Sequence, residues 1–298
     1  MAKVLITGGT GFIGRQVTKE LLNRGYEVFS ISKNTVQAAS VSLHPIRLDL
    51  LSLSDVSAFF KEFQFDNLLH MAWYVGPKCH GANINIDWLA ASLHLIKCFC
   101  EAGGRKLLCN GTVSEYDFSY GYLQEDMTPL ANKSLHGQSK ASLYNVISRY
   151  ASQNNIEFKW PRIFNLYGPN EKPQRLMPSV INACLRGEDV KVSDCLKFQD
   201  YLHVEDTARG IVDVFEKDIS GAVNICSGKP VQLREIVTKI AELTGFNGEI
   251  LWGAVPAAFG DDLVVGNNEK LKSIGWKPKY SLEEGLKMTI DWWRKNNV

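Results

Sequence analysis

Short apolar runs alternate with longer stretches of helical periodicity through the first half of the chain. The runs are rich in Val, Ile and Leu, which is typical of strands buried on both faces of a parallel sheet. Strands are predicted at residues 3–6, 27–31, 45–48, 67–70, 106–109 and 158–161, and helices at 12–22, 54–63, 86–102 and 134–154. This alternation predicts an α/β fold, a Rossmann-type doubly wound parallel sheet that binds ligands beyond the carboxyl ends of its strands.

The pattern loosens after residue 161, where Gly168-Pro169-Asn170 indicates a loop. A mixture of short strands and helices follows, as a smaller mixed α/β substrate domain would have. Its last helix is well marked, because Ser281 and Glu284 form a capping box. Apolar residues then share one face of that helix, namely Leu282, Leu286, Ile290 and Trp293. We expect a dinucleotide-binding domain over residues 1–162, rejoined by part of about 200–225, and a mainly substrate-binding domain over 163–298.

The turn after the first strand reads TGGTGFIG over residues 7–14. Glycines at this spacing allow a tight turn, a close approach of pyrophosphate to the backbone, and packing of helix on strand. Free N–H groups and the helix dipole then face the phosphates. A glycine-rich turn is weak evidence by itself, but its place between a β-branched strand and an amphipathic helix favours a dinucleotide site. The expected cofactor contacts in this turn are Gly8, Gly11, Phe12, Ile13 and Gly14.

Charge and hydropathy exclude several function classes. Lys and Arg total 33 against 32 Asp and Glu, and no run of like charge occurs, so neither nucleic acid nor a membrane surface is expected as a partner. No apolar run approaches the ~20 residues of a membrane span. The first residues already form a strand, which leaves no room for a signal peptide. With seven cysteines and no CxxC spacing, a cytoplasmic protein with mostly buried thiols is expected.

No metal is expected. His70, Cys79 and His80 are potential ligands, but their spacing matches no familiar metal site.

Several segments, taken in order, resemble the extended short-chain dehydrogenase/reductases that act on nucleotide sugars. Besides the glycine turn, the resemblance rests on HMA at 70–72, RIFNLYGP at 162–169, QDYLHV at 199–204 and GWKP at 275–278. It covers essentially the whole chain, and it is specific because the order and spacing agree. The resemblance implies a Rossmann fold, a nicotinamide dinucleotide and a nucleotide-sugar substrate.

The resemblance also implies residue roles. Asp49 and Leu50 would meet the adenine, and the segment 70–72 would line the diphosphate and ribose, with Met71 and Ala72 as contacts. Segments 176–178 and 190–193 would border the nucleotide base. The expected substrate contacts are Tyr74, Asn165, Arg175 and Leu176. Helices 86–102 and 134–154 resemble those that form a four-helix bundle in homodimers of this family, so a homodimer is expected.

The end of the second strand bears on the choice of cofactor. NAD-binding proteins usually place an acidic residue there to accept the adenosine ribose hydroxyls. This chain has Ser32, followed by Lys33. A cation offsets the charge of a 2′-phosphate, which favours NADP(H). If Lys33 is only a solvated loop residue, NAD remains possible.

Catalysis in the family uses a Thr or Ser, a Tyr, and a Lys four residues after the Tyr. Thr112 and Lys140 match the first and last, but His136 replaces the Tyr in HGQSK. On a helix, His136 and Lys140 share a face one turn apart. An imidazolium could protonate a forming alkoxide, although a neighbouring ammonium opposes its formation. The alternative proton donors are a water molecule, Tyr74, Tyr116 and Tyr122.

Two arginines that grip the substrate diphosphate in the family are absent. Gln199 stands in the R-D-Y-x-H-V segment, and Ala258 stands in the segment that usually reads R-P-G-D or R-P-G-E. Loss of bidentate guanidinium contacts weakens diphosphate binding. The cations that could compensate are Arg162, Lys172, Arg175 and Lys191.

The residues directly after Thr112 in the sequence bear on the class of reaction. Dehydratases of the family have an acidic residue there, whereas this chain has Val113 and Ser114, and Glu115 is one place too late. Reduction of a keto sugar and epimerisation through a keto intermediate remain. The family's C4 epimerases use NAD, so an NADP(H) site favours a reductase acting at C4 of a nucleotide-linked 4-keto-6-deoxyhexose. A non-catalytic NADP(H) sensor is the third alternative, against which the retained Thr112 and Lys140 argue.

Overall fold

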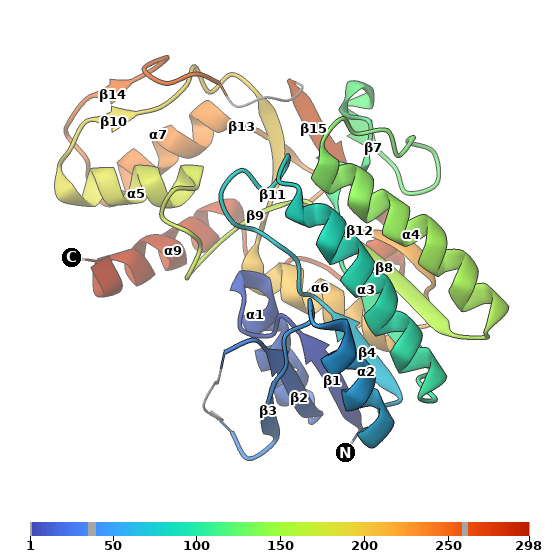
Figure 1. Cartoon of the computed structure of the whole chain (residues 1–298). Coiled ribbons are helices and arrows are strands. Elements are labelled where there is room, and N and C mark those ends of the chain that lie inside the picture. The colour runs from blue at the N-terminus through green and yellow to red at the C-terminus, as the bar shows by residue number, and fades with distance from the viewer. Residues whose placement is uncertain (1, 35–39, 258–261, 298) are drawn as a thin grey trace.

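A computed structural model describes residues 2–34, 40–257 and 262–297 (Figure 1). Its first lobe is built on a parallel sheet with strand order β3-β2-β1-β4-β5-β8-β12, and β6 pairs beside β8. The chain reverses direction across this sheet between β1 and β4, which is the switch point where doubly wound folds bind ligands. The strands are β1 (Lys3–Thr7), β2 (Glu27–Ser32), β3 (Leu43–Arg47), β4 (Asn67–His70), β5 (Lys106–Cys109), β6 (Gly111–Thr112), β8 (Glu157–Ile163) and β12 (Gly221–Ile225). The predicted fold class is therefore confirmed.

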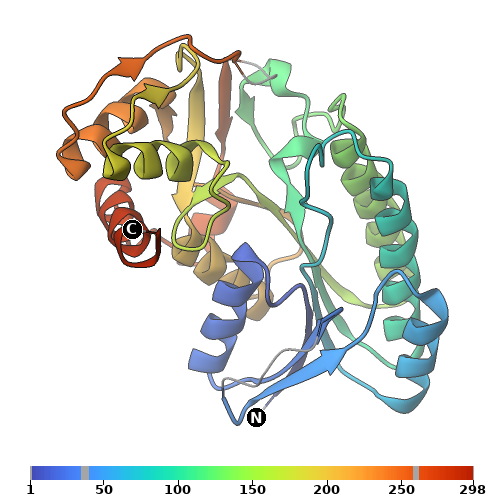
Figure 2. The ribbon, with the colours of Figure 1, turned by 60° about the vertical axis from the view of Figure 1, so that its left-hand side comes forward.

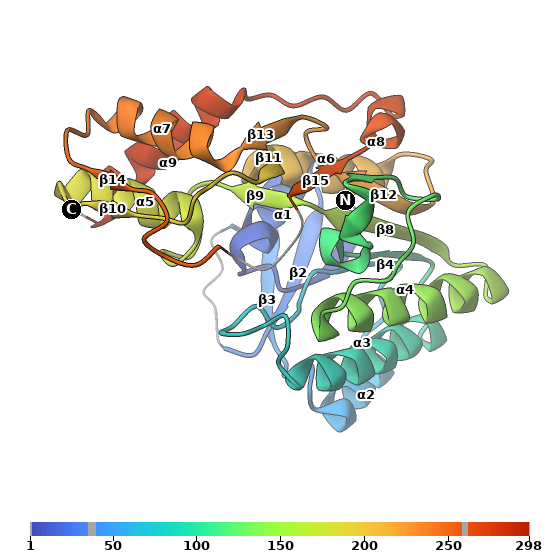
Figure 3. The ribbon, with the colours of Figure 1, turned by 90° about the horizontal axis from the view of Figure 1, so that it is seen from above.

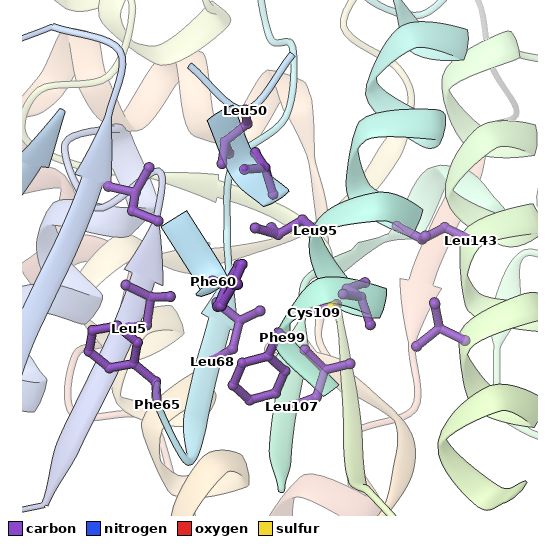
Figure 4. Packing of buried hydrophobic residues seen from close by; sticks show 14 of the residues in the cluster. Leu5, Leu50, Phe60, Phe65, Leu68, Leu95, Phe99, Leu107, Cys109 and Leu143 are labelled. Carbon is purple, nitrogen blue, oxygen red and sulfur yellow. The ribbon is translucent and has the colours of Figure 1, made fainter. Parts of the chain in front are cut away.

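Helices cover both faces of this sheet (Figures 1 and 2). One face carries α1 (Phe12–Asn23) and α6 (Val204–Glu216), which pack against each other. The other face carries α2 (Leu53–Glu62), α3 (Ile84–Glu101) and α4 (Leu135–Gln153). Figure 4 shows the core of this second face, where Leu95 and Phe99 of α3 pack over Leu68 and Leu107 of the sheet.

The predicted strands and helices occur at the expected places, with shifted ends. The third strand runs from Leu43 to Arg47, so it begins two residues before and ends one residue before the predicted 45–48, and Pro45 lies inside it. Proline lacks a backbone N–H group, and β3 tolerates it because the strand lies at the sheet edge and pairs with β2 on one side.

The second lobe combines a small mixed sheet with three helices (Figure 3). Its main sheet has the order β13-β11-β15-β7, β9 pairs with β11, and β10 pairs with β14. The strands are β7 (Tyr122–Leu123), β9 (Asn165–Tyr167), β10 (Val190–Lys191), β11 (Phe198–His203), β13 (Pro230–Gln232), β14 (Ile250–Leu251) and β15 (Leu263–Gly266). The helices are α5 (Leu176–Arg186), α7 (Leu233–Thr244) and α9 (Leu282–Asn297), and a short helix α8 (Glu269–Ser273) lies near β12.

The start of α9 has the predicted capping box. The Glu284 backbone N–H donates to Ser281 Oγ at 3.3 Å, and the Ser281 backbone N–H donates to Glu284 Oε2 at 2.8 Å. Leu286, Ile290 and Trp293 of the predicted apolar face are buried in the core of the second lobe.

Segments distant in sequence tie the two lobes together. Of residues 200–225, α6 and β12 join the first lobe, whereas β11 lies in the sheet of the second. Within the described part of the chain, no helix is long and apolar enough to cross a membrane.

Candidate active site

The glycine turn between β1 and α1 is closely packed against neighbouring backbone. Gly8 has φ +70°, and a Cβ atom there would lie 2.7 Å from the Ala72 backbone nitrogen. A Cβ on Gly14 would lie 2.0 Å from the Gly8 carbonyl oxygen. Glycine is therefore required at both positions. Gly11, the N-cap of α1, gives no side-chain cap, so the first N–H groups of the helix remain available to an anion.

A cavity of about 550 Å³ opens beside this turn, at the carboxyl ends of β1 and β2. Tyr74, expected from the sequence to touch the substrate, lies on its wall, and the Tyr74 hydroxyl donates to the Pro77 carbonyl at 3.2 Å. The cavity brings together many of the predicted cofactor residues, namely Gly8, Ser32, Lys33, Asp49, Leu50 and Ala72.

Two of these cofactor residues contact each other. Lys33 Nζ lies 2.8 Å from Asp49 Oδ2, and the Lys33 side chain is 73% exposed. The hydrogen bond from Lys33 lowers the pKa of the Asp49 carboxyl. Such an exposed pair contributes about 1 kcal/mol or less, so an arriving phosphate can recruit Lys33 at small cost.

Helix α4 lies directly against the turn that carries Thr112. A Cβ on Gly137 would fall 1.8 Å from the Ser114 carbonyl oxygen, so only glycine permits this approach. The contact brings the start of α4, with His136 and Lys140, close to the end of β6, where Thr112 lies.

Lys140 is buried in an aromatic and carbonyl environment. Its Nζ donates to the Asn110 carbonyl at 2.8 Å and lies 4.0 Å from the ring centroid of Trp73. Burial lowers the pKa of Lys140 to about 8. The Lys140 amine is thus mostly protonated at neutral pH, and its pKa is close enough to neutral for it to exchange a proton.

His136 lies beside the same tryptophan, with the two rings edge to face at 6.1 Å. Its Nδ1 is 3.3 Å from Asn85 Oδ1. Burial, reinforced by the positive charge of Lys140 and by His80, lowers the pKa of His136 to about 3. The imidazole is therefore neutral at pH 7 in the protein without ligands. The charge of Lys140 lowers this pKa, as the sequence predicted, and desolvation by burial lowers it by a larger amount.

Glu115 holds the backbone of Thr112. Its Oε1 accepts the Thr112 N–H at 2.8 Å, and its Oε2 accepts from Arg162 Nε at 2.7 Å. Trp160 Nε1 donates to both carboxylate oxygens at 3.1 Å. The carboxylate is fully buried, so it turns into the core, as its displaced position in the sequence suggested.

Arg162 and Tyr116 are committed to this buried cluster. The Arg162 guanidinium pairs with Glu115, so it cannot replace the missing diphosphate arginines as the sequence analysis considered. The Tyr116 hydroxyl donates to Asn224 Oδ1 at 2.7 Å and accepts from Arg162 at 3.0 Å. Burial raises the pKa of Tyr116, which makes it unsuited as the alternative proton donor. Tyr122 lies on β7, in the sheet of the second lobe.

Among the expected substrate contacts, Asn165 is affected by the replacement of a family arginine with Gln199. Asn165 Nδ2 donates to Gln199 Oε1 at 2.9 Å, so the predicted sugar contact touches the residue that replaces one arginine. Arg175 is the N-cap residue of α5, and Leu176 is its first residue. A second cavity, of about 680 Å³, lies beside α5 and β10 and includes Lys191. Ala258 lies outside the described residues.

Sequence reasoning missed the roles of three residues at the site: Asn85, Trp73 and Glu115. Asn85 looks like an ordinary polar residue at the start of a helix. Trp73 follows the fourth strand, where loops line the site, but its contact with Lys140 is not visible in the sequence. The capping-box spacing of Thr112 and Glu115 is visible in the sequence and could have revealed the third. Among residues 2–34, 40–257 and 262–297, no group of three or more His, Cys, Asp or Glu side chains is placed to hold a metal ion.

Comparison with known proteins assigns the family. The model of the NAD dependent epimerase/dehydratase family matches residues 4–226. The chain belongs to this family. Over 99% of its length it is 26% identical to GDP-L-fucose synthase 1 of Arabidopsis thaliana, covering 94% of that protein. Over 98% of its length it is 27% identical to UDP-glucose 4-epimerase of Bacillus subtilis, covering 96%.

The fold agrees with solved members of the family. The UDP-glucose 4-epimerase of Thermus thermophilus, solved in complex with NAD, superimposes with a TM-score of 0.87. It is 26% identical to this chain, and the match covers 99% of this chain and 100% of that one. Proteins named as nucleotide-sugar epimerases, dehydratases and reductases thus all occur among the relatives similar to this chain.

Proposed function

We propose that this chain is an NADP(H)-dependent reductase of the C4 keto group of a nucleotide-linked 6-deoxyhexulose. The observation that carries the proposal is the end of β2, where Ser32 and Lys33 line the cavity beside the glycine turn. A cation and a hydroxyl suit the 2′-phosphate of NADP(H), because they offset its charge and donate to its oxygens. A cofactor that is exchanged at each turnover suits a reductase.

The cofactor residues fit a dinucleotide held along the carboxyl edge of the sheet. The close packing at Gly8 and Gly14 leaves no room for a side chain, and Leu50, expected to meet the adenine, lines the cavity together with Tyr74, expected to contact the substrate. In this proposal the first lobe, with α6 and β12, binds the cofactor, and the rest of the second lobe binds the substrate. Bound NADPH supplies the hydride to the sugar carbon.

The chain's own residues then act on the sugar oxygen. Lys140 holds the nicotinamide ribose, the Thr112 hydroxyl donates to the keto oxygen, and His136 exchanges the proton with that oxygen. On the substrate side, Asn165, Arg175 and Leu176 contact the sugar and diphosphate.

With Arg162 excluded, the remaining substitutes for the lost arginines are Lys172, Arg175 and Lys191. The cavity beside α5 and β10 borders the nucleotide base. Seven free thiols fit a reducing compartment such as the cytoplasm.

The test is loss of NADPH absorbance, with NADH in parallel, on addition of TDP-, GDP- and CDP-linked 4-keto-6-deoxyhexoses. We expect rapid oxidation of NADPH with one of them. Lys33→Asp should reverse the preference between NADPH and NADH, whereas Lys277→Asp, at an exposed loop lysine, should leave it unchanged. An unchanged preference in Lys33→Asp would refute the cofactor assignment. Tight NADPH binding without turnover of any substrate would favour the sensor.

An epimerase is the second candidate, favoured by the neutral state of His136. A neutral imidazole can accept a proton from a sugar hydroxyl, which is the first step of epimerisation through a keto intermediate. Interconversion of two nucleotide sugars with tightly retained cofactor, and with no net change in absorbance, would establish this activity instead.

We also propose a homodimer through α3 and α4. These helices lie side by side on one flank of the molecule (Figures 1 and 3). Ile86 of α3 is 57% exposed and Val146 of α4 is 52% exposed. Apolar side chains on two adjacent helices suit a four-helix interface.

A further inference from the structure

The neighbours of Asn85 determine the orientation of its buried amide. Its Nδ2 donates to the carbonyls of Cys79 at 2.7 Å and Ala82 at 2.8 Å, and carbonyls can only accept. Its Oδ1 accepts from Trp73 Nε1 at 2.8 Å, and an indole N–H can only donate. If Oδ1 and Nδ2 exchanged places, Oδ1 would face two carbonyl oxygens and the NH₂ group would face the indole N–H. Because Asn85 is 0% exposed, such a mismatch would go unrelieved by water.

This orientation determines which nitrogen of His136 carries the proton. The atom 3.3 Å from His136 Nδ1 is Asn85 Oδ1, which can only accept, so Nδ1 must be the N–H. A neutral imidazole has a single N–H group, and Nε2 is therefore a bare acceptor. The backbone N–H of His136 donates to the His80 carbonyl at 3.0 Å, so the segment that positions Asn85 also holds the start of α4.

Asn85 is unable to pass a proton onward. An amide oxygen accepts a hydrogen bond but has no proton to give, so the ring is not a relay between its two nitrogens. Among the described residues no hydrogen bond joins Lys140 Nζ to His136 Nδ1, and Nζ donates to the Asn110 carbonyl. No hydrogen bond to His136 Nε2 is found among the described residues, which leaves Nε2 available to a ligand.

We propose that Asn85 is a positioning residue that holds His136 as the Nδ1–H tautomer and so makes Nε2 the atom that exchanges the substrate proton. The proposal rests on the proposed hydride-transfer function. In oxidation, neutral Nε2 takes the proton of the sugar hydroxyl while hydride leaves the sugar carbon for the nicotinamide and the C–O bond becomes C=O, and the imidazolium then releases this proton to solvent water. In reduction, Nε2 first takes a proton from solvent water, hydride bonds to the carbonyl carbon, the C=O π electrons move to oxygen, and this oxygen takes the Nε2 proton. The ring thereby returns to its neutral Nδ1–H form.

The tautomer can be read by long-range ¹H–¹⁵N correlation spectra of the ¹⁵N-histidine-labelled protein at pH 7, without ligand and with NADP⁺. His136 is assigned by the signal lost in His136→Gln. We expect a protonated Nδ1 and an unprotonated Nε2 in the parent. Asn85→Leu, which removes the acceptor for Nδ1–H, should lose this pattern. Asn83→Leu is the matched control, because Asn83 is exposed and its side chain makes no capping hydrogen bond.

A spectrum of the parent protein with a protonated Nε2 would overturn the proposal. This measurement does not depend on whether any variant folds. An Asn85→Leu protein that keeps both the Nδ1–H pattern and the parent kcat would also overturn it. We expect instead a fall in kcat of at least tenfold for Asn85→Leu, with the Kd for NADPH within twofold of the parent. Failure of every substrate to oxidise NADPH would defeat the proposed function but leave the spectra as an independent result.

Discussion

Replacement of Glu115 by Gln tests the buried cluster that supports Thr112. Glu115 and Arg162 are 0% and 1% exposed, so neither charge is solvated by water. Glutamine keeps the shape of the side chain, but its NH₂ group must face N–H donors that now point at a carboxylate oxygen. The change therefore removes a charge while it barely alters packing.

The expected loss in free energy of unfolding follows from the buried charge of Arg162, which loses its ion pair with Glu115 in the Glu115→Gln variant. Arg162 would lose its only ion-pair partner among the described residues, and removal of one member of a buried pair costs about 3–5 kcal/mol. Loss of this amount is large beside the ~5–15 kcal/mol by which domains are stable. The Thr112 N–H would also compete for the single amide oxygen, so kcat should fall as well.

Urea unfolding followed by tryptophan fluorescence and far-UV circular dichroism measures the difference in free energy of unfolding. Glu188→Gln is the control, because the Arg186–Glu188 pair is exposed by more than half on both sides and should contribute about 1 kcal/mol or less. The double variant Glu115→Gln/Arg162→Met should be more stable than Glu115→Gln alone, since it removes the unpaired charge. A loss below 1 kcal/mol for Glu115→Gln, or strictly additive effects in the double variant, would refute the reasoning.

Three further predictions concern Gly137, Lys140 and Glu171. Gly137→Ala should cost about 1–3 kcal/mol and most of kcat, because its Cβ would meet the Ser114 carbonyl, whereas Gly81→Ala, with open space around it, should leave both unchanged in the same assays. Lys140→Met should abolish hydride transfer. It should also remove a rise in parent stability of up to about 3 kcal/mol between pH 8 and 10.5, since the folded protein sheds this buried proton first. For Glu171, burial raises the carboxyl pKa to about 8, so parent stability should fall as pH rises from 4.5 to 8, and thermal unfolding of Glu171→Gln should lack that fall.

The fold could be predicted from the sequence because hydrophobic periodicity and capping motifs depend only on residues close together in the chain. Buried strands such as residues 67–70 and the capping box at Ser281 depend on neighbouring residues, and both occur in the structure where they were predicted. Thr112 and Lys140 could be proposed as site residues for the same reason, since each lies in a recognisable motif, and their catalytic roles stay predictions.

Contacts between elements distant in the sequence could not be derived in this way. The hydrogen bond between Asn85 and His136 joins residues 51 positions apart, and the Lys33–Asp49 ion pair joins the ends of two strands. Both depend on how helices and strands come to lie together, which the spacing of residues in one segment does not encode. Tyr116 shows the converse, because its hydroxyl is a plausible acid in the sequence and a structural hydrogen-bond partner in the fold.

The late position of α6 and β12 in the chain has a consequence for synthesis on the ribosome. Apolar residues of β1 and α1, among them Val4 and Leu21, pack against Ile211 and Phe215 of α6 and against Trp276. Until those later segments have emerged, the part of this face that α6 covers stays exposed beside α1, and β8 has an open edge where β12 will pair. Chains truncated before residue 225 therefore expose apolar surface and an unpaired strand, the features that recruit chaperones and promote aggregation.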